Sequence, residues 1–137
     1  MQAKAKSAAL PALSILIADD DADTMLTLSE LLRDEGHAVH TCADAGFVIE
    51  ALQRYAPDVC ILDIVMPRKT GFALAREIVA MKLAKRPVLI AMTGVFAQPA
   101  DKVAVVGAGF DHVMSKSSAP EELLRLLEEI AAPPRAA

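Results

Sequence analysis

Short apolar segments alternate along the chain with longer segments that carry apolar residues at helical spacing. Three of the short segments, at residues 15–17, 59–62 and 88–91, are continuously apolar, as is typical of strands that are covered on both faces. The pattern therefore predicts an α/β domain in which a parallel sheet lies between two helical layers. The expected strands are residues 14–18, 38–41, 59–62, 88–92 and 112–114.

Residues that favour helix ends mark five expected helices. Gly36 suits a left-handed cap after the first helix, and the third helix is expected to begin near Thr70. Ser118 and Glu121 form an S-x-x-E capping box before the last helix. The second and fourth helices are expected at residues 43–55 and 99–107.

The length of the chain suits one ordinary domain. Its 137 residues can bury a single core, and 54% of them are hydrophobic but only 4% aromatic, so that the core must be mostly aliphatic. We expect the folded domain at residues 14–131, between flexible tails at 1–13 and 132–137. Met1 and the short tails favour a complete protein over a domain cut from a larger one.

Charge and cysteine positions exclude several classes of protein. The formal net charge is −4, and the basic residues are scattered, which argues against direct nucleic-acid binding. Pro11 interrupts the apolar stretch at 8–18, which also lacks a signal-peptide cleavage site, and no apolar run reaches the roughly 20 residues that span a bilayer. Cys42 and Cys60 match neither a redox pair nor a zinc site. We expect a cytoplasmic protein with reduced thiols and no membrane insertion.

Polar residues follow the expected strands. Asp19 and Asp20 come after the first strand, Asp63 after the third, Thr93 after the fourth and Lys116 after the fifth. In an open parallel sheet the carboxyl ends of the strands meet at one edge, and ligands bind there. The five residues are therefore expected to share one site.

Three carboxylates at one edge would repel each other, and a divalent cation removes that repulsion. Mg²⁺ prefers oxygen ligands and is commonly held by one or two carboxylates together with phosphate oxygens. We expect Asp20 and Asp63 to bind Mg²⁺ directly, Asp19 to act through water, and the main-chain carbonyl of Val65 to supply a further oxygen.

The same residues suit phosphoryl transfer, which needs a nucleophile in line and positive charge around the transferred group. Asp63 is the expected nucleophile and phosphoacceptor. Mg²⁺ and the Lys116 ammonium would neutralise the phosphoryl oxygens, while the Thr93 hydroxyl and the Gly94 amide could donate hydrogen bonds to them.

Simpler interpretations exist for parts of this pattern. Asp21 or Asp23 could cap the first helix. An EF-hand loop beginning at Asp19 fails because Thr24 stands where glycine is needed. Phosphatases with a nucleophilic aspartate in the first loop use a D-x-D-x-[T/V] pattern, which has no match here. Lys116 by itself would more often be an ordinary solvated lysine.

The motifs together resemble the receiver domain of two-component response regulators. They are A-D-D at 18–20, L-D-I-V-M-P at 62–67, Gly71, M-T-G at 92–94 and Lys116. The resemblance covers roughly residues 14–131 and implies a flavodoxin-like, doubly wound, five-stranded parallel sheet in the order 2-1-3-4-5 with five helices. It also implies Mg²⁺ as cofactor and a histidine kinase or a histidine phosphotransfer protein as phosphoryl donor.

The resemblance predicts a single-domain response regulator in phosphorelay signal transduction, similar to chemotaxis regulators. Such a protein catalyses only its own phosphorylation and dephosphorylation, and switches a protein-binding surface, here expected over the fourth helix, fifth strand and fifth helix at about 99–130. Two positions depart from the family pattern: Ser117 replaces the usual proline after the lysine, and Val113 replaces an aromatic residue. They favour an alternative, a receiver-like module that binds proteins without phosphorylation.

Overall fold

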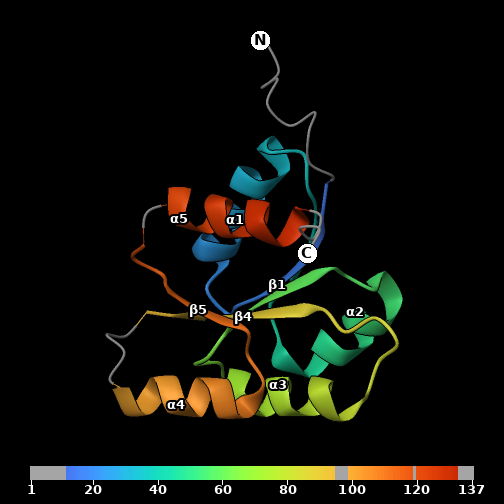
Figure 1. Cartoon of the computed structure of the whole chain (residues 1–137), viewed down its shortest axis with the longest axis vertical. Helices are drawn as coiled ribbons and strands as arrows, with labels where there is room; N and C mark the ends of the chain where they lie inside the picture. Colours follow the sequence, from blue (N-terminus) through green and yellow to red (C-terminus); the bar gives the residue numbers. More distant parts are fainter. Residues whose placement is uncertain (1–11, 95–98, 119, 133–137) are drawn as a thin grey trace, which may run out of the picture.

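The computed structural model describes residues 12–94, 99–118 and 120–132. Five parallel strands form one sheet in the order β2-β1-β3-β4-β5 (Figure 1). The strands are β1 Ser14–Ala18, β2 Ala38–Cys42, β3 Val59–Asp63, β4 Val88–Thr93 and β5 His112–Ser115. The helices are α1 Ala22–Asp34, the 3₁₀ turn η2 Ala45–Phe47, α2 Val48–Tyr55, α3 Gly71–Ala80, α4 Pro99–Ala108 and α5 Pro120–Ala131. The predicted flavodoxin-like topology is confirmed.

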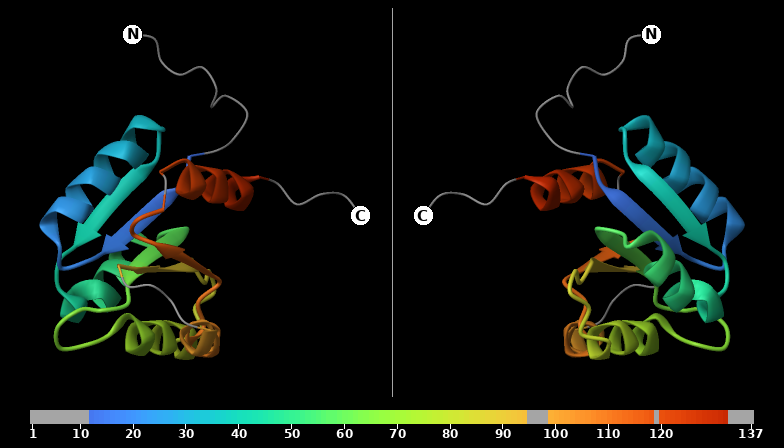
Figure 2. Two further views of the ribbon diagram at one scale, coloured as in Figure 1. Left: turned by 90° about the vertical axis from the view of Figure 1, so that its left-hand side faces the viewer. Right: turned by 90° about the vertical axis from the view of Figure 1, so that its right-hand side faces the viewer.

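Helices cover both faces of the sheet, with α1 and α5 on one face and α2, α3 and α4 on the other (Figures 1 and 2). Alternate residues of each central strand therefore enter different cores. The core under α1 and α5 includes Ile15, Ile17, Ile61, Leu32 and Leu127. The core under the other three helices includes Leu16, Leu62, Leu52, Leu74 and Val105. Burying each such side chain contributes roughly 1.5–3 kcal/mol, which explains the continuously apolar strands.

Four strands extend one residue further than their sequence pattern indicated. Asp63 pairs in register with Met92 and Thr93 pairs with Ser115, so the ladder continues into polar positions. Hydropathy cannot detect this extension because the added residues include an aspartate and a threonine. The predicted site residues Asp63 and Thr93 thus belong to the sheet itself, which holds their backbones rigidly.

The second helix begins later than predicted. The expectation of a helix over 43–55 is wrong at its start, since a 3₁₀ turn occupies Ala45–Phe47 and α2 begins only at Val48. The Asp44 carboxylate accepts a hydrogen bond of 2.7 Å from the Gly46 amide, which favours a tight local turn. Ala56, in the left-handed conformation, ends the helix.

Other helix ends follow their predicted signals. The Thr70 hydroxyl accepts a hydrogen bond of 3.2 Å from the Ala73 amide and caps α3. Gly36 has a φ of 96° just after α1, as a left-handed cap requires. The capping box of Ser118 and Glu121 stays a prediction, since residue 119 between them lies outside the described part of the chain.

The folded part begins before the predicted boundary at residue 14. Leu13 is buried, its amide donates a hydrogen bond of 3.0 Å to Nδ1 of His37, and its carbonyl accepts one of 2.9 Å from the Ala38 amide. The rest of the predicted tails, at 1–11 and 133–137, lies outside the described residues. Among the helices that the structure describes, none has both the length and the apolar character to cross a membrane.

The two cysteines are buried and unbridged. Cys60 lies in β3, and burial raises the pKa of its thiol to about 12, so that the thiol stays protonated at neutral pH. Burial likewise raises the pKa of Cys42. Cys60 behaves as a small apolar side chain, whereas the Cys42 thiol donates a hydrogen bond of 3.3 Å to the Asp44 carbonyl.

Candidate functional site

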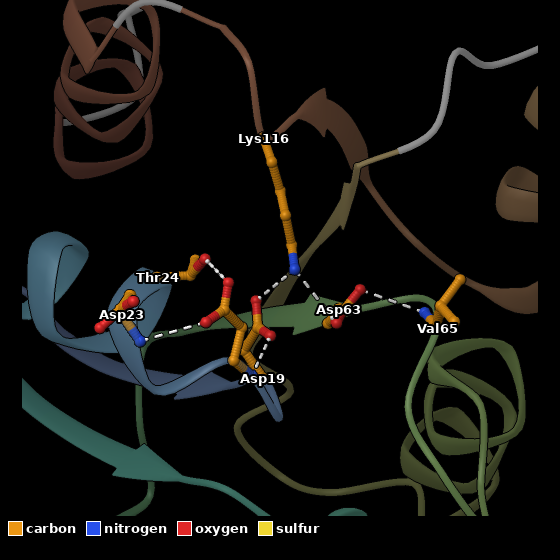
Figure 3. A network of polar contacts seen from close by, with 7 residues as sticks. Asp19, Asp23, Thr24, Asp63, Val65 and Lys116 are labelled. Atoms are coloured by element: carbon orange, nitrogen blue, oxygen red, sulfur yellow. Dashed lines mark hydrogen bonds and ion pairs between the residues drawn. The ribbon is translucent and has the colours of Figure 1, made fainter.

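The carboxyl edge of the sheet brings together residues from four strands that lie far apart in the sequence. Asp19 follows β1 directly, Asp63 ends β3, Thr93 ends β4 and Lys116 follows β5. Figure 3 shows the Lys116 side chain reaching down between Asp19 and Asp63. The parallel sheet causes this meeting because all of its strands point to the same edge.

Lys116 bridges two buried carboxylates. Its Nζ lies 2.8 Å from Oδ2 of Asp19 and 3.2 Å from Oδ2 of Asp63 (Figure 3). The side chains of Asp19 and Asp63 are only 3% and 4% exposed, so these ion pairs are shielded from water far better than surface pairs. Sequence reasoning placed Lys116 beside Asp63 but missed its shorter contact with Asp19.

The Asp63 carboxyl group has a raised pKa. Burial raises its pKa to about 6, and the neighbouring negative charge of Asp19 adds to the effect, while the Val65 amide and Lys116 oppose it. The Val65 amide donates a hydrogen bond of 3.1 Å to Oδ1 of Asp63. Asp63 is therefore mostly ionised at pH 7, but its buried charge is unfavourable. Neutralisation of that charge by a cation or by a covalent partner would be favourable.

The pKa of Lys116 is raised. Burial by itself would lower it, but the hydrogen bonds and charges of Asp19 and then Asp63 outweigh burial. Lys116 consequently stays protonated at neutral pH and serves as a fixed positive charge in the site.

Oxygen atoms of Asp19, Asp20 and Asp63 all lie within 4.8 Å of one another. Asp19 and Asp63 are buried, whereas Asp20 is exposed at the opening of the site. Among the described residues, Lys116 alone forms ion pairs with Asp19 and Asp63. Even with this ammonium included, the cluster keeps an excess of negative charge. Such a set of hard oxygen donors fits a divalent cation of the magnesium type.

The loop after β1 has a second, structural role. Oδ1 of Asp19 accepts a hydrogen bond of 2.9 Å from the Asp21 amide. Asp21 caps α1, accepting hydrogen bonds from the Asp23 amide at 3.2 Å and from the Thr24 hydroxyl at 2.7 Å. The Thr24 bond contributes most to lowering the pKa of Asp21. The helix-cap interpretation thus holds for Asp21, while Asp19 faces the site.

The loop after β3 closes tightly over the site. A Cβ atom at Gly71 would lie 2.5 Å from the main-chain oxygen of Asp63, so that only glycine fits there. The Gly71 amide also donates a hydrogen bond of 2.9 Å to the carbonyl of Ile64. This close approach to the backbone of Asp63 explains why a glycine stands at residue 71.

Thr93 and Lys116 are also linked through the backbone. The Lys116 amide donates a hydrogen bond of 2.8 Å to the carbonyl of Thr93, and the Thr93 residue is buried. Ser115, which sequence reasoning did not single out, lies opposite Thr93 at the end of β5. The signal that could have found it is the serine-rich run S-K-S-S around Lys116.

An apolar cavity of about 290 Å³ adjoins Lys116 between α1 and α5. Both apolar and polar side chains line it. The apolar ones include Leu28, Leu31, Met92, Met114 and Leu123. The polar ones include Asp23, Thr24 and Ser118.

Comparisons with known proteins agree with this geometry. The response regulator receiver domain model matches residues 15–128. An uncharacterized 14.6 kDa protein of Leptolyngbya boryana is 33% identical over 129 residues, 93% of this chain and 98% of that protein. PilH of Pseudomonas aeruginosa is 31% identical over 119 residues, 86% of this chain and 97% of PilH.

Other relatives are longer. The transcriptional regulatory protein PdtaR of Mycobacterium tuberculosis is 37% identical over 80 residues, which cover 58% of this chain but only 39% of PdtaR. Among solved structures, the chemotaxis protein CheY4 of Vibrio cholerae has a TM-score of 0.80 at 27% identity, over 88% of this chain and 99% of that chain. The family model and the full-length relatives establish that this chain belongs to the response regulator receiver domains, the signalling modules of two-component systems.

Proposed function

We propose that the chain is a cytoplasmic single-domain response regulator that accepts a phosphoryl group on Asp63 in a Mg²⁺-dependent reaction. The observation that carries this proposal is the buried Asp63 carboxylate, whose pKa is raised to about 6 and which Lys116 contacts at the carboxyl edge of the sheet. A buried nucleophile beside a fixed ammonium is the arrangement that phosphoryl transfer requires.

The metal would be held by Asp20, Asp63 and the main-chain carbonyl of Val65, with Asp19 acting through water. The clustering of the three carboxylates within 4.8 Å supports this assignment. A bound Mg²⁺ ion would supply positive charge to the oxygens of the transferred phosphoryl group. The exposure of Asp20 leaves the cluster open to an incoming cation.

The residues of the chain then have separate roles in the phosphoryl transfer. A carboxylate oxygen of Asp63 forms the bond to phosphorus while the bond from phosphorus to the donor's histidine nitrogen breaks, and the imidazole keeps that electron pair. Lys116 moves from the Asp63 carboxylate to the new phosphoryl oxygens. The Thr93 hydroxyl and the Gly94 amide donate hydrogen bonds to the same oxygens.

The donor would be a histidine kinase or a histidine phosphotransfer protein. The apolar cavity beside Lys116 supports a donor approach over α1 and the start of α5, because a side chain of the donor could fill it. The output surface would be α4, β5 and α5, where Val103 and Val106 are 74% and 71% exposed and offer apolar contact to a downstream protein.

The test is intact mass spectrometry after incubation with acetyl phosphate and Mg²⁺. Wild type is expected to gain about 80 Da as a labile adduct, whereas Asp63→Asn is expected to gain nothing. Asp58→Asn is the matched control, because Asp58 is a carboxylate at the opposite edge of the sheet and should leave the adduct intact. Equal labelling of wild type and Asp63→Asn would contradict the proposal.

A second candidate is a receiver-like module that binds its partner without phosphorylation. The observation that favours it is Val113, which packs against the core under α2, α3 and α4 and has no ring that could rotate. The two candidates are separated by a pull-down of the downstream partner with Asp63→Asn. Undiminished binding and cellular activity of this variant would support the module and displace the phosphoacceptor.

A further inference from the structure

The turn that carries Lys116 is closed by the hydroxyl of Ser115, which the Ser117 hydroxyl also contacts. The Ser117 amide donates a hydrogen bond of 3.1 Å to Oγ of Ser115, and the two hydroxyl oxygens lie 2.8 Å apart. The Ser118 amide donates a hydrogen bond of 3.0 Å to the Ser115 carbonyl. A hydroxyl that accepts from the amide two residues later forms a recognised turn, and Lys116 is the residue enclosed by it.

The backbone of Lys116 is thereby held from several directions. Its own amide is bonded to the Thr93 carbonyl at 2.8 Å, and its side-chain stem passes Gly94, where an added Cβ would lie 3.6 Å from the lysine Cδ. A lysine side chain has many rotatable bonds, and its ammonium can reach many positions. Fixing the backbone and the direction of the stem narrows this range. Here that direction leads to Asp19 and Asp63.

We propose that Ser115 is a positioning residue whose hydroxyl-closed turn holds the Lys116 ammonium between Asp19 and Asp63. The inference rests on the proposed phosphorylation of Asp63 for its consequence, but the positioning itself exists in the unphosphorylated protein. Small displacements of a charge that stabilises a transferred group cost large factors in rate, so loosening this turn should slow the reaction.

Three substitutions separate the hydroxyl of Ser115 from the rest of the turn. Ser115→Ala removes the acceptor, and the partner groups of Ser117 are exposed enough for water to replace it, so that the fold should persist. Ser115→Thr keeps a hydroxyl at the same position and should restore the turn. Ser117→Ala is the matched control, because it keeps the amide donor and removes only the second hydroxyl.

Phosphorylation rates with acetyl phosphate and Mg²⁺ give the first readout. We expect Ser115→Ala to react at least about fivefold more slowly than wild type, while Ser115→Thr and Ser117→Ala stay within about twofold. The Mg²⁺ dissociation constant, measured by calorimetry, should not rise in any variant, since no metal-binding oxygen is changed. A general structural defect would instead weaken Mg²⁺ binding and slow the reaction together, without rescue by threonine.

The second readout needs no phosphorylation. In ¹⁵N spectra the Lys116 ammonium should be protected from exchange in wild type and Ser115→Thr, and broadened in Ser115→Ala. A protected ammonium and a wild-type rate in Ser115→Ala would overturn the inference, as would failure of threonine to restore either property. If no protein is phosphorylated but the ammonium signal follows the expected order, the proposed function fails while the positioning role of Ser115 stands.

Discussion

Aspartates mark both edges of the sheet, but they are paired differently. At the amino edge, Asp58 forms an ion pair of 2.8 Å with Lys85 and accepts a hydrogen bond of 2.8 Å from the Ser14 amide. Asp111 accepts hydrogen bonds from Arg86 at 3.0 Å and from the Leu89 amide at 2.8 Å. Each of these two carboxylates thus has a basic side chain and a strand amide of its own.

At the carboxyl edge, Lys116 serves two buried carboxylates, and a third lies within the same cluster. The contrast appears in the pKa values. Burial would raise the pKa of Asp58, but Lys85 and the Ser14 amide outweigh it and lower the pKa, whereas the pKa of Asp63 is raised to about 6. One edge uses its carboxylates to hold strands together, and the other keeps charge that a ligand can neutralise.

The largest expected difference between the two edges is in the effect of removing one lysine from each. Lys116→Met should lower the rate of phosphorylation by acetyl phosphate about 100-fold, because an ammonium that stabilises the transferred group is lost. Its Mg²⁺ affinity should not weaken, since the carboxylates lose a competing cation. Lys85→Met is the control and should stay within about twofold of the wild-type rate. Equal losses in both variants would contradict the division between the edges.

The pH dependence of the reaction should show the raised pKa of Asp63. Above about pH 6 the carboxylate is ionised, and below it the proton blocks both metal binding and attack on phosphorus. At low Mg²⁺ the initial rate at pH 5 should be about one tenth of that at pH 8, and more Mg²⁺ should move the midpoint to lower pH. A rate that stays constant down to pH 5 at low Mg²⁺ would exclude a perturbed Asp63 as the nucleophile.

The smallest expected effects are on stability, where the two edges should respond with opposite signs. Asp58→Asn should destabilise the protein by about 1 kcal/mol at pH 7, because it breaks hydrogen bonds at a partly exposed ion pair. Asp63→Asn should stabilise the metal-free protein by about 1 kcal/mol at pH 7, because it removes a buried, poorly neutralised charge. Urea unfolding without Mg²⁺ measures both.

The pH dependence of these stability differences has a defined direction. The folded protein binds a proton at Asp63 more tightly than the unfolded chain does, so the wild type gains stability as the pH falls from about 6 to about 4, and the advantage of Asp63→Asn should disappear there. The contribution of Asp58 has the opposite sign: its lowered pKa gives stability above the unfolded value of about 4, which is lost as the pH falls through the folded value. Parallel pH profiles for the two variants would contradict the comparison.

The sequence by itself determined the architecture of the domain. Continuously apolar strands at 15–17, 59–62 and 88–91 are typical of strands covered on both faces, and between helical segments they indicate a parallel sheet with helices on both sides. Once the sheet is parallel, residues after its strands must meet at one edge, so the grouping of Asp19, Asp63 and Lys116 follows from the sequence.

The tertiary structure decided how those residues divide their contacts. The shorter ion pair of Lys116 with Asp19, the burial of Asp19 beside the exposed Asp20, and the turn closed by Ser115 depend on how separate elements pack. A hydrophobic pattern reports only which face of its own element is buried. Contacts between distant polar side chains depend on packing and on local electrostatics. Both of these are set by neighbours that come together only in the folded chain, so a pattern along the sequence does not reveal them.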